Sequence, residues 1–448
     1  MNGYEKYQSS FNGFPIARPE YISRPESYAE LKPSQIISIA RGLGGSYGDA
    51  ALNAQGELIL TNRLDRFLEF DAHNGILSVE SGVSLAKILE LVVKKGWFLP
   101  AMPGTAEVSL GGCIATDIHG KNHWHAGSLG HHVISLQLIT DTGARINCSP
   151  KVLPELFWAT IGGMGLTGII GVATLQLKRI ETAYMKVRHR VAHNLKQILE
   201  DLGREDDEFE YSVAWLDALN KPFSRGVIMK AKHANLLDLP ISKQKHAFVT
   251  TKYSAFKCPY LLPFPLLHPL LVKLFNKVYN YSLAKKNNTF LQAYSNYFFP
   301  LDRIRNWPRL YGKKGFIQYQ CVIPTQLAYF AIKDILQALQ KHKHPIYLAV
   351  LKRFGQENLA PLSFPLPGFT LALDIPICGD RLFTCLDSLD EIVIQAGGRV
   401  YLAKDARLKP KAFRDMYIRY PEWLAVKQYW DPHNRFSSSL SRRLNLDL

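Results

Sequence analysis

The sequence predicts an α+β protein with two lobes, and three observations lead to this fold class. The chain has 448 residues, enough for two or three domains with buried cores. Hydrophobic residues make up 47% and charged residues 21%, which is typical of globular proteins rather than coiled coils or low-complexity chains. Strand-like runs alternate with helical patterns in the first third of the chain, whereas the middle is richer in aromatic residues and less regular.

The clearest predicted element is an amphipathic helix that begins after Ser84, a good N-terminal cap, and ends at Gly96. Its apolar face would contain Leu85, Ile88, Leu89, Val92 and Val93. In the same third of the chain we expect strands at 36–40, 58–61, 76–80, 133–140 and 169–177, a helix at 155–161, and a long glycine-rich loop region at 103–130. Further along we expect helices at 326–340 and 380–395 and strands at 347–352 and 369–374.

The charge of the chain points to acidic partners. The net charge is +16 and the pI is near 9.4. Residues 239–301 contain eight lysines and no Asp or Glu, and within them 260–275 is strongly apolar but interrupted by three prolines. A regular membrane-spanning helix is therefore not expected. Two interpretations stay open: a surface loop over a hydrophobic patch, or contact with the surface of an anionic membrane.

Cysteine and histidine spacing argues against a disulfide scaffold and a metal site. The six cysteines form no CxxC pair, so we expect reduced and mostly buried thiols. Residues 1–28 show no apolar segment behind a basic start, which predicts a cytoplasmic protein without a secretory signal. No acidic residue or cysteine of suitable spacing completes a tetrahedral set with the clustered His119, His123, His125, His131 and His132, so no metal is predicted.

Glycine-rich segments carry the strongest functional signal. Gly163, Gly165 and Gly168 match G-x-G-x-x-G, but a strand-like run follows them where a dinucleotide-binding turn requires a helix, so a Rossmann site is rejected. Three other segments, 40–50, 103–105 and 109–120, are rich in small residues. Their freed backbone N–H groups could together hold a pyrophosphate without a lysine or a metal.

The sequences of these segments and their order along the chain resemble those of a known family. ARGLGGSYGD, PGTAEVSLGGCIATDIHGKNHWHAGSLGHHV and ELFWATIGGMGLTGII are similar to the FAD-binding domain of the vanillyl-alcohol-oxidase and p-cresol-methylhydroxylase superfamily. GFIQYQCVIP, PLSFPLPG, YLAKDAR and DPHNRFSSSLSRRL resemble, within it, the decaprenylphosphoryl-β-D-ribose 2'-oxidase family. The resemblance implies an FAD domain at 1–182, a substrate domain on an antiparallel sheet at 183–398, and a segment at 399–448 that returns to the FAD domain.

The resemblance also implies which residues contact FAD. They are small residues and backbone donors suited to phosphates, with apolar groups near the rings. The implied contacts are Ala40, Arg41, Gly42, Leu43, Gly44, Gly45, Ser46, Tyr47, Gly48, Asp49, Ala50, Gly104, Ser109, Leu110, Gly111, Gly112, Thr116, Asp117, Ile118, His119, Ile170 and Tyr401. Related sugar and alditol oxidases often attach the flavin to a histidine at the position of Gly45, so we expect non-covalent FAD.

For catalysis the resemblance points to Lys404 and His119 beside the flavin. A cation at Lys404 would hold the reacting hydroxyl and stabilise alkoxide character while hydride leaves. The substrate pocket implied by the family contains Tyr47, Gln318, Gln320, Lys352, Phe354, Asp374 and Lys404. Gln318 and Gln320 alternate onto one face of a strand, and Lys352 offers a charge for a sugar phosphate.

The family implies oxidation of the 2'-hydroxyl of a polyprenylphosphoryl pentose to a 2'-keto sugar. This would be the first half of an epimerisation that yields the arabinose donor for cell-envelope glycans, completed by a separate short-chain reductase. Because the substrate is a lipid, we expect a protein that is peripheral at the inner membrane, with 239–301 in contact with it. The alternative is a soluble sugar, alditol or aldonolactone oxidase that uses oxygen. A non-catalytic membrane or nucleic-acid binder would leave the glycine-rich segments unexplained.

Overall fold

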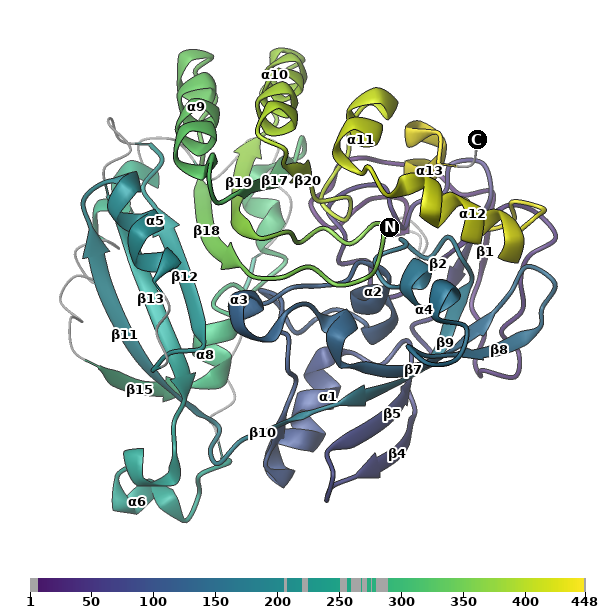
Figure 1. Cartoon of the computed structure of the whole chain (residues 1–448), viewed down its shortest axis with the longest axis horizontal. Helices are drawn as coiled ribbons and strands as arrows, with labels where there is room; N and C mark the ends of the chain where they lie inside the picture. Colours follow the sequence, from purple (N-terminus) through teal and green to yellow (C-terminus); the bar gives the residue numbers. More distant parts are fainter. Residues whose placement is uncertain are drawn as a thin grey trace.

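Figure 1 shows the computed structural model, which combines helices with several β-sheets. It describes residues 7–204, 208–219, 225–249, 256–258, 267, 272–274, 276–278 and 289–446. The mixed helix and sheet content agrees with the predicted α+β class.

The largest sheet has eight strands, and each pairing within it is antiparallel. In spatial order the strands are β15 (Phe290–Ala293), β11 (Tyr184–Ala192), β13 (Gly226–His233), β12 (Tyr211–Leu216), β18 (Leu348–Phe354), β19 (Gly368–Pro376), β17 (Phe316–Pro324) and β20 (Arg399–Val400). One face of this sheet packs against helices α5 (Leu195–Gly203), α9 (Ala328–Lys341) and α10 (Arg381–Gln395) in a shared hydrophobic core (Figure 1). Side chains that alternate to the opposite face are therefore left for the rest of the molecule.

Two smaller sheets are built mostly from the first 180 residues. The five-stranded sheet is antiparallel, in the order β4 (Phe67–Asp71), β5 (Ile76–Glu80), β9 (Ile169–Gln176), β7 (Val133–Ile139) and β8 (Arg145–Cys148). The three-stranded sheet is parallel, in the order β1 (Tyr21–Ser23), β3 (Glu57–Leu60) and β2 (Ser38–Arg41). Two-residue strands form the pairs β6 (Trp97–Phe98) with β10 (Lys178–Arg179), and β14 (Phe256–Lys257) with β16 (Ile304–Arg305).

The remaining helices are short. They are α1 (Leu85–Val92), η2 (Val93–Lys95), α2 (Leu110–Ala115), α3 (His123–Ala126), η3 (Leu129–His132), α4 (Pro154–Thr160), η4 (Leu236–Asp238), α6 (Ile241–Gln244), α8 (Tyr294–Phe298), η5 (Trp307–Tyr311), α11 (Pro410–Met416), α12 (Tyr420–Trp430) and α13 (Ser439–Leu444). A second hydrophobic core joins the five-stranded sheet and α1 to α8 and to the β11–β13 end of the large sheet. This second core lies against the face of the large sheet that α5, α9 and α10 leave free.

Most elements predicted from the sequence are present within two residues of their expected ends. Helix α1 begins as predicted, since the Ser84 side chain accepts a hydrogen bond from the Lys87 amide at 3.2 Å, and its predicted apolar face is buried. Gly96 ends the following turn with a φ of 79°, a left-handed conformation that suits glycine. The Rossmann interpretation was rightly rejected, because strand β9 and not a helix follows Gly168.

One prediction is wrong. The segment 103–130 is not a continuous loop, because α2, α3 and η3 lie within it. Glycines at 111 and 112 hid helix α2 from sequence reasoning, since glycine disfavours helix interiors. The close approach of the helix to residue 81 explains the glycine. A Cβ on Gly111 would lie 2.7 Å from the Ser81 Cβ, so a larger residue would collide with the segment that follows β5.

The acid-free segment 239–301 is only partly described. Most of its apolar stretch 260–275, including Leu266, Leu270 and Leu271, lies outside the described residues. Among the helices that the structure does describe, none is both long and apolar enough to cross a bilayer. All six cysteines are free thiols, and five are buried as expected, with Cys378 exposed.

Candidate active site

The free face of the large sheet collects polar side chains from three adjacent strands. Gln318 and Gln320 of β17 lie opposite Asp374 and Ala372 of β19, and Lys352 of β18 lies opposite Thr370 of β19. Since side chains alternate along a strand, all of these residues share one face. The strand register therefore brings together the predicted Gln318, Gln320, Lys352 and Asp374.

Lys404 reaches this face from the segment after β20. The Tyr401 amide donates a hydrogen bond to the Gln320 carbonyl at 2.9 Å, and the Lys404 amide donates to the Tyr401 carbonyl at 2.9 Å. These bonds tie the segment to the edge of the sheet. The Lys404 Nζ lies 3.4 Å from the centre of the Tyr47 ring, a cation–π contact, and Lys404 and Gln318 line the same small cavity.

Asp374 is the buried carboxylate of the site. Its Oδ1 accepts a hydrogen bond from the Gln318 Nε2 at 2.6 Å. Burial raises the pKa of Asp374 to about 6, while the Gln318 hydrogen bond and the charge of Lys404 act in the opposite direction. At neutral pH the group is mostly ionised, but close enough to its pKa to exchange a proton.

Three lysines converge on the same region. Burial lowers the pKa of Lys404 to about 7 and that of Lys352 to about 8. Lys121, from the segment before α3, has a pKa lowered to about 7 by burial and by the charge of Lys352. None of the three forms an ion pair with a described carboxylate. Three lysines with one nearby carboxylate, Asp374, in one buried region make an environment that favours an anion.

His119 joins this cluster through Gln320. The Gln320 Nε2 lies 3.0 Å from the His119 Nε2 and also donates to the Thr370 Oγ1 at 3.2 Å. Burial and the charges of Lys352, His123 and Lys404 hold the pKa of His119 well below its usual range. With Gln320 donating to its Nε2, the neutral imidazole carries its proton on Nδ1, which has no hydrogen-bond partner among the described residues. His119 therefore offers a donor to a ligand rather than a second positive charge.

Aromatic rings hold the His119 imidazole in place. Its centre lies 4.7 Å from that of Phe354, 5.4 Å from Phe364 and 5.2 Å from Tyr401. Tyr401 stacks on Phe364 and donates its hydroxyl to the Thr116 carbonyl at 2.9 Å. Phe354, predicted as a pocket residue, thus acts here by packing against the imidazole.

The loop at 40–50 presents backbone donors rather than side chains. The amides of residues 43 to 46 donate no hydrogen bond to any residue that the structure describes. Gly44 has a φ of 72°, and successive amides in such a turn form a concave anion-binding nest. The Arg41 guanidinium is buried beneath the turn, where it donates to the carbonyls of Ala51 and Ser9, each at 2.9 Å. Two of the five guanidinium donors of Arg41 thus hold the loop from below.

Asp49 is likewise occupied by the protein. Arg443 of α13 binds both Asp49 carboxylate oxygens, at 2.7 and 2.9 Å, and forms an ion pair with Asp405 at 2.9 Å. A Cβ on Gly48 would lie 1.6 Å from the Asp405 carbonyl oxygen, so the loop and the Lys404 segment touch backbone to backbone. Arg443 and Gly48 thereby fix Lys404 next to the nest.

Asp117 forms a buried hub. Its carboxylate accepts hydrogen bonds from the Ser128 Oγ at 2.8 Å, the Asn358 Nδ2 at 2.7 Å, the Gly130 amide at 2.8 Å and the Ser363 hydroxyl. This hub joins the 117–130 segment to the connection between β18 and β19. The Asp117 carboxylate is thus fully engaged by the protein, and its amide donates to the Ile114 carbonyl at 3.0 Å.

The other predicted cofactor residues surround these groups. Gly104 is open, with nothing within 4 Å of a Cβ placed there, and Ser109 is the N-cap of α2. Buried in the same region are Ala50, Ser109, Leu110, Gly111, Ile118 and Ile170. Free backbone donors, an open glycine and apolar walls suit a phosphate-bearing cofactor with a flat ring system, so the residues present fit FAD.

Sequence reasoning overlooked Lys121. It lies two residues after His119 in an acid-free stretch, 118–140, and this local excess of positive charge was the available signal. Its Nζ donates to the Tyr297 carbonyl and lies 4.2 Å from the centre of the Tyr297 ring. The Ser212 amide donates to the Lys121 carbonyl at 2.8 Å, which anchors the residue to strand β12.

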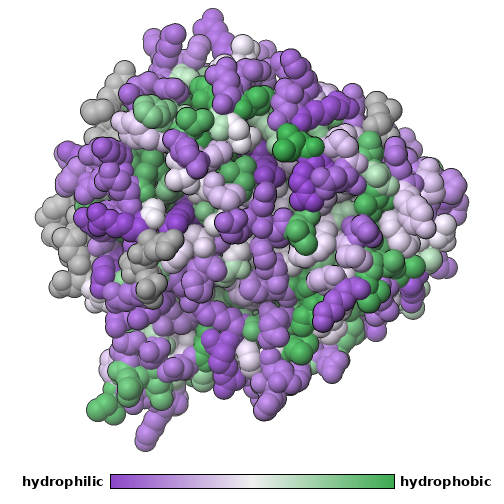
Figure 2. Space-filling model, in the orientation of Figure 1, coloured by the Kyte–Doolittle hydropathy of each residue, from purple (hydrophilic) through white to green (hydrophobic). Residues whose placement is uncertain are grey.

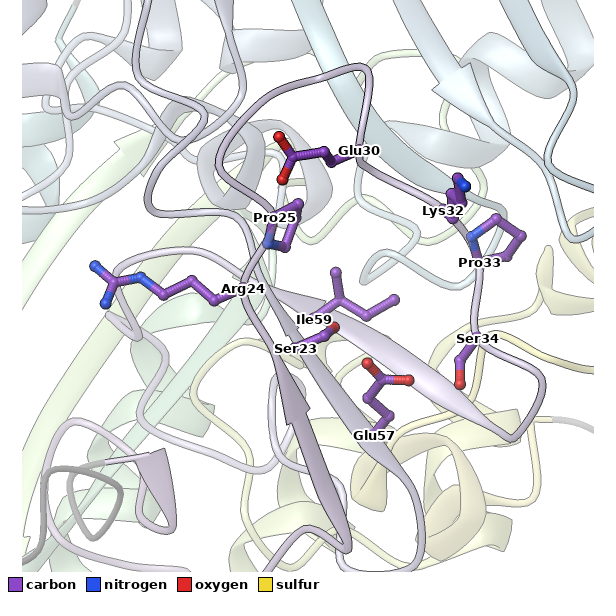
Figure 3. Close-up of a pocket in the computed structure, with 9 residues that line it drawn as sticks. All are labelled: Ser23, Arg24, Pro25, Glu30, Lys32, Pro33, Ser34, Glu57 and Ile59. Atoms are coloured by element: carbon purple, nitrogen blue, oxygen red, sulfur yellow. The ribbon is translucent and has the colours of Figure 1, made fainter.

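Two other features do not form sites. Figure 3 shows a hollow outside this region, where Arg24, Lys32, Glu30 and Glu57 mix both charges around the β1–β3 edge and none of the predicted site residues takes part. Within the described residues, no three His, Cys, Asp or Glu side chains are grouped as a metal site would require. His123 instead accepts a hydrogen bond from the Gly355 amide at 3.1 Å.

Comparison with known proteins agrees with this geometry. The profile of the FAD binding domain matches residues 28–149. The chain is 38% identical to decaprenylphosphoryl-β-D-ribose oxidase of Mycolicibacterium smegmatis over 96% of this chain and 93% of that protein. L-Gulonolactone oxidase of Bos taurus is 24% identical over 93% of each chain. L-Gulono-1,4-lactone dehydrogenase of Mycobacterium tuberculosis is 22% identical over 97% of this chain and 98% of that protein.

The match to the FAD binding domain and these relatives define the class of protein: this is an FAD-dependent oxidoreductase that acts on CH–OH groups. Identity of 38% along almost the full length narrows the class further. The chain belongs to the decaprenylphosphoryl-β-D-ribose oxidase family of FAD-binding flavoproteins.

Proposed function

We propose that this protein oxidises the 2'-hydroxyl of a polyprenylphosphoryl pentose to the 2'-keto sugar, the first half of an epimerisation that yields an arabinose donor for cell-envelope glycans. The observation that carries the proposal is a group of three lysines at the free face of the large sheet, Lys121, Lys352 and Lys404, none of which forms an ion pair with a described carboxylate. A neutral sugar gives no reason to bury so much net positive charge, whereas a sugar phosphate does.

The two ends of the substrate would use different groups. Gln318, Gln320 and Asp374 offer amide and carboxylate groups from adjacent strands to the sugar hydroxyls. Lys352 and Lys121 would bind the phosphate, because neither has a described carboxylate partner and a bound anion favours the protonated form of each. The small Ala372 between Asp374 and Thr370 leaves room for the ring.

When bound, FAD supplies the hydride acceptor. Lys404, in its protonated form, would donate to the reacting hydroxyl oxygen and stabilise the negative charge that develops there, while the hydroxyl proton would pass to the Asp374 carboxylate, whose pKa of about 6 suits a proton acceptor. The charge of Asp374 favours this protonated form, because it raises the pKa of Lys404 against the effect of burial. His119 would offer its unpartnered Nδ1 donor to the ligand, and its lowered pKa keeps the imidazole neutral at neutral pH.

FAD would be held without a covalent link. Gly45 has no side chain to form one, and a Cβ there would lie 2.5 Å from the Val108 Cγ1, so the backbone runs against its neighbour. We expect acid denaturation to release all of the yellow colour into the supernatant. Flavin that stays with the precipitate would contradict this.

The proposed substrate also implies where in the cell the protein works. A polyprenyl phosphate resides in a bilayer, so the protein would work as a peripheral protein on the cytoplasmic face of the inner membrane, with the acid-free segment 239–301 in contact with it. The keto product must be reduced to complete the epimerisation, which calls for a separate short-chain reductase.

Anaerobic bleaching of the flavin tests the proposal. We expect polyprenylphosphoryl ribose to bleach it, and the unphosphorylated pentose to bleach it at least about tenfold more slowly at equal concentration, because the lysines then bind nothing. A second candidate, oxidation of an aldonolactone, is favoured by the likeness to L-gulonolactone oxidase over 93% of each chain. Faster bleaching by L-gulono-1,4-lactone than by the lipid-linked sugar would select it.

A further inference from the structure

The segment that follows β13, up to residue 249, forms a small projection that the proposed site does not use. We call residues 235–249 the tip; it contains η4 and α6 and lies at the lower left of Figure 1, away from the body of the molecule. Its backbone is well anchored: the Ala183 amide donates to the Ala247 carbonyl at 2.8 Å, and the Ala234 amide, just before the tip, donates to the Tyr184 carbonyl at 2.9 Å.

Large apolar side chains on the tip face water. Leu237 is 90% exposed and Ile241 is 85% exposed, four residues apart, and Val249 is 62% exposed. Figure 2 shows hydrophobic residues beside hydrophilic ones on this projection. Single exposed apolar residues are ordinary, but three on one short anchored projection form a patch that calls for a partner.

The tip and its base carry a net positive charge, although the Glu181 carboxylate accepts a hydrogen bond from the Leu236 amide at 2.9 Å. Lys243 and Lys245 are exposed on either side of Gln244, and Lys232 lies at the base of the tip. The single acidic residue of the tip, Asp238, is already bound by Lys186 at 2.8 Å and caps η4 through the Asn235 amide. The tip therefore presents exposed apolar side chains within a net positive rim.

We propose that the tip is a membrane-docking element, in which Leu237 and Ile241 insert among the lipids of an anionic bilayer while Lys243 and Lys245 contact the headgroups. The choice of a bilayer over a protein partner rests on the proposed function, which requires a lipid-borne substrate, and on the positive rim. The anchoring matters as well, because a tip held rigid loses little conformational entropy when it docks.

The test is flotation of the full-length protein with vesicles that contain no sugar substrate. Wild type should float with vesicles of equal parts phosphatidylglycerol and phosphatidylcholine, and less with phosphatidylcholine alone. The double variant Leu237→Ser/Ile241→Ser should bind at least about tenfold more weakly. Lys243→Gln/Lys245→Gln should lose only the preference for anionic vesicles, and ~0.5 M NaCl should have the same effect on wild type.

A matched control uses exposed apolar residues elsewhere. Ile418, between α11 and α12, is 81% exposed, and Phe330 of α9 is 63% exposed. Phe330→Ser/Ile418→Ser should float as wild type does. Equal loss in this control, or unchanged flotation of the tip variant, would overturn the proposal. So would a wild-type dimer in gel filtration that the tip variant dissociates, since the patch would then bind a second copy.

The two proposals fail separately. Bleaching of the flavin by a short-chain, water-soluble sugar phosphate does not require docking, so it should be equal in wild type and in the tip variant. Bleaching without flotation would reject the docking element alone. Flotation through the tip, with no bleaching by any phosphorylated pentose, would reject the proposed function alone.

Discussion

The nest at 40–50 and the polar face of the large sheet differ in what they leave free. Around the nest the ionisable side chains are already bound: Arg41 to two carbonyls, Asp49 to Arg443, and Asp117 to four donors. What remains free is backbone amide. On the sheet face the reverse holds, because the backbone is paired in the ladder and the ammonium groups of Lys352 and Lys404 have no described carboxylate partner. One region offers a ligand backbone donors, and the other offers side-chain charge.

This contrast predicts opposite responses to mutation. Near the nest, adding a Cβ where two backbone segments touch should destabilise the fold, and removing a buried charge should do the same. On the sheet face, removing a charge should damage chemistry or affinity and spare the fold.

The largest effect is expected at Gly48. Gly48→Ala places a Cβ 1.6 Å from the Asp405 carbonyl oxygen, a backbone atom that cannot move away alone. We expect a destabilisation above ~3 kcal/mol and loss of bound FAD, measured by thermal unfolding and by the ratio of absorbance at 450 and 280 nm.

Gly104→Ala is the matched control, because nothing lies within 4 Å of its Cβ. It should keep its stability. If Gly104→Ala loses FAD at wild-type stability, Gly104 contacts the cofactor as predicted. A Gly48→Ala protein that is yellow and stable would show that the close backbone contact at Gly48 is not needed for stability or for FAD binding.

Next in size is Lys404→Ala. We expect retention of FAD and a loss of at least about two orders of magnitude in the rate of flavin reduction, typical of one preorganised electrostatic group. Stopped-flow absorbance under anaerobic conditions measures it. Because Lys404 has no ion pair to break among the described residues, the thermal stability of the variant should not fall. Near-normal reduction would move the role elsewhere, first to His119.

Asp117→Asn should act on the fold. The Asn oxygen can keep the three donors that bind Oδ2, but its NH2 group then faces the Gly130 N–H and the buried charge is lost, so we expect a loss of about 2–3 kcal/mol from the free energy of unfolding in urea. Backbone strain is not the cause, since Asp117 has a φ of 41° and asparagine tolerates this region as well as aspartate does. An unchanged midpoint would mean that the hub contributes no stability.

The smallest effect concerns the phosphate end. Burial lowers the pKa of Lys121 to about 7 and of Lys352 to about 8, so both lose their protons as the pH rises through this range. We expect the KM for a phosphorylated sugar to rise about tenfold between about pH 6 and about pH 9, and Lys121→Met to flatten this profile with little change in kcat. A sugar without phosphate is the control. The same pH dependence for both substrates would exclude the lysines as its cause.

Patterns of local origin were readable from the sequence. The helix after Ser84, strand β5 and helix α10 follow from capping, alternation and helical spacing, which depend on neighbours along the chain. The glycine-rich segments and the motif order pointed to FAD, and the FAD binding domain profile confirms that prediction. The role of each named residue, and the division of the chain at 182 and 398, stay predictions.

The tertiary structure alone decided how the charges are used. The sequence contains Arg41, Asp49 and Asp117 within motifs that suggest ligand contact, yet each is bound to partners distant in the chain, and no local pattern reveals that. Lys121 joins Lys352 and Lys404 only because strand register and a backbone bond to Ser212 bring three distant segments together. Their lowered pKa values follow from burial, which depends on the packed whole. Helix and strand signals are local and can be read along the chain, whereas electrostatics depends on distances that only the fold sets.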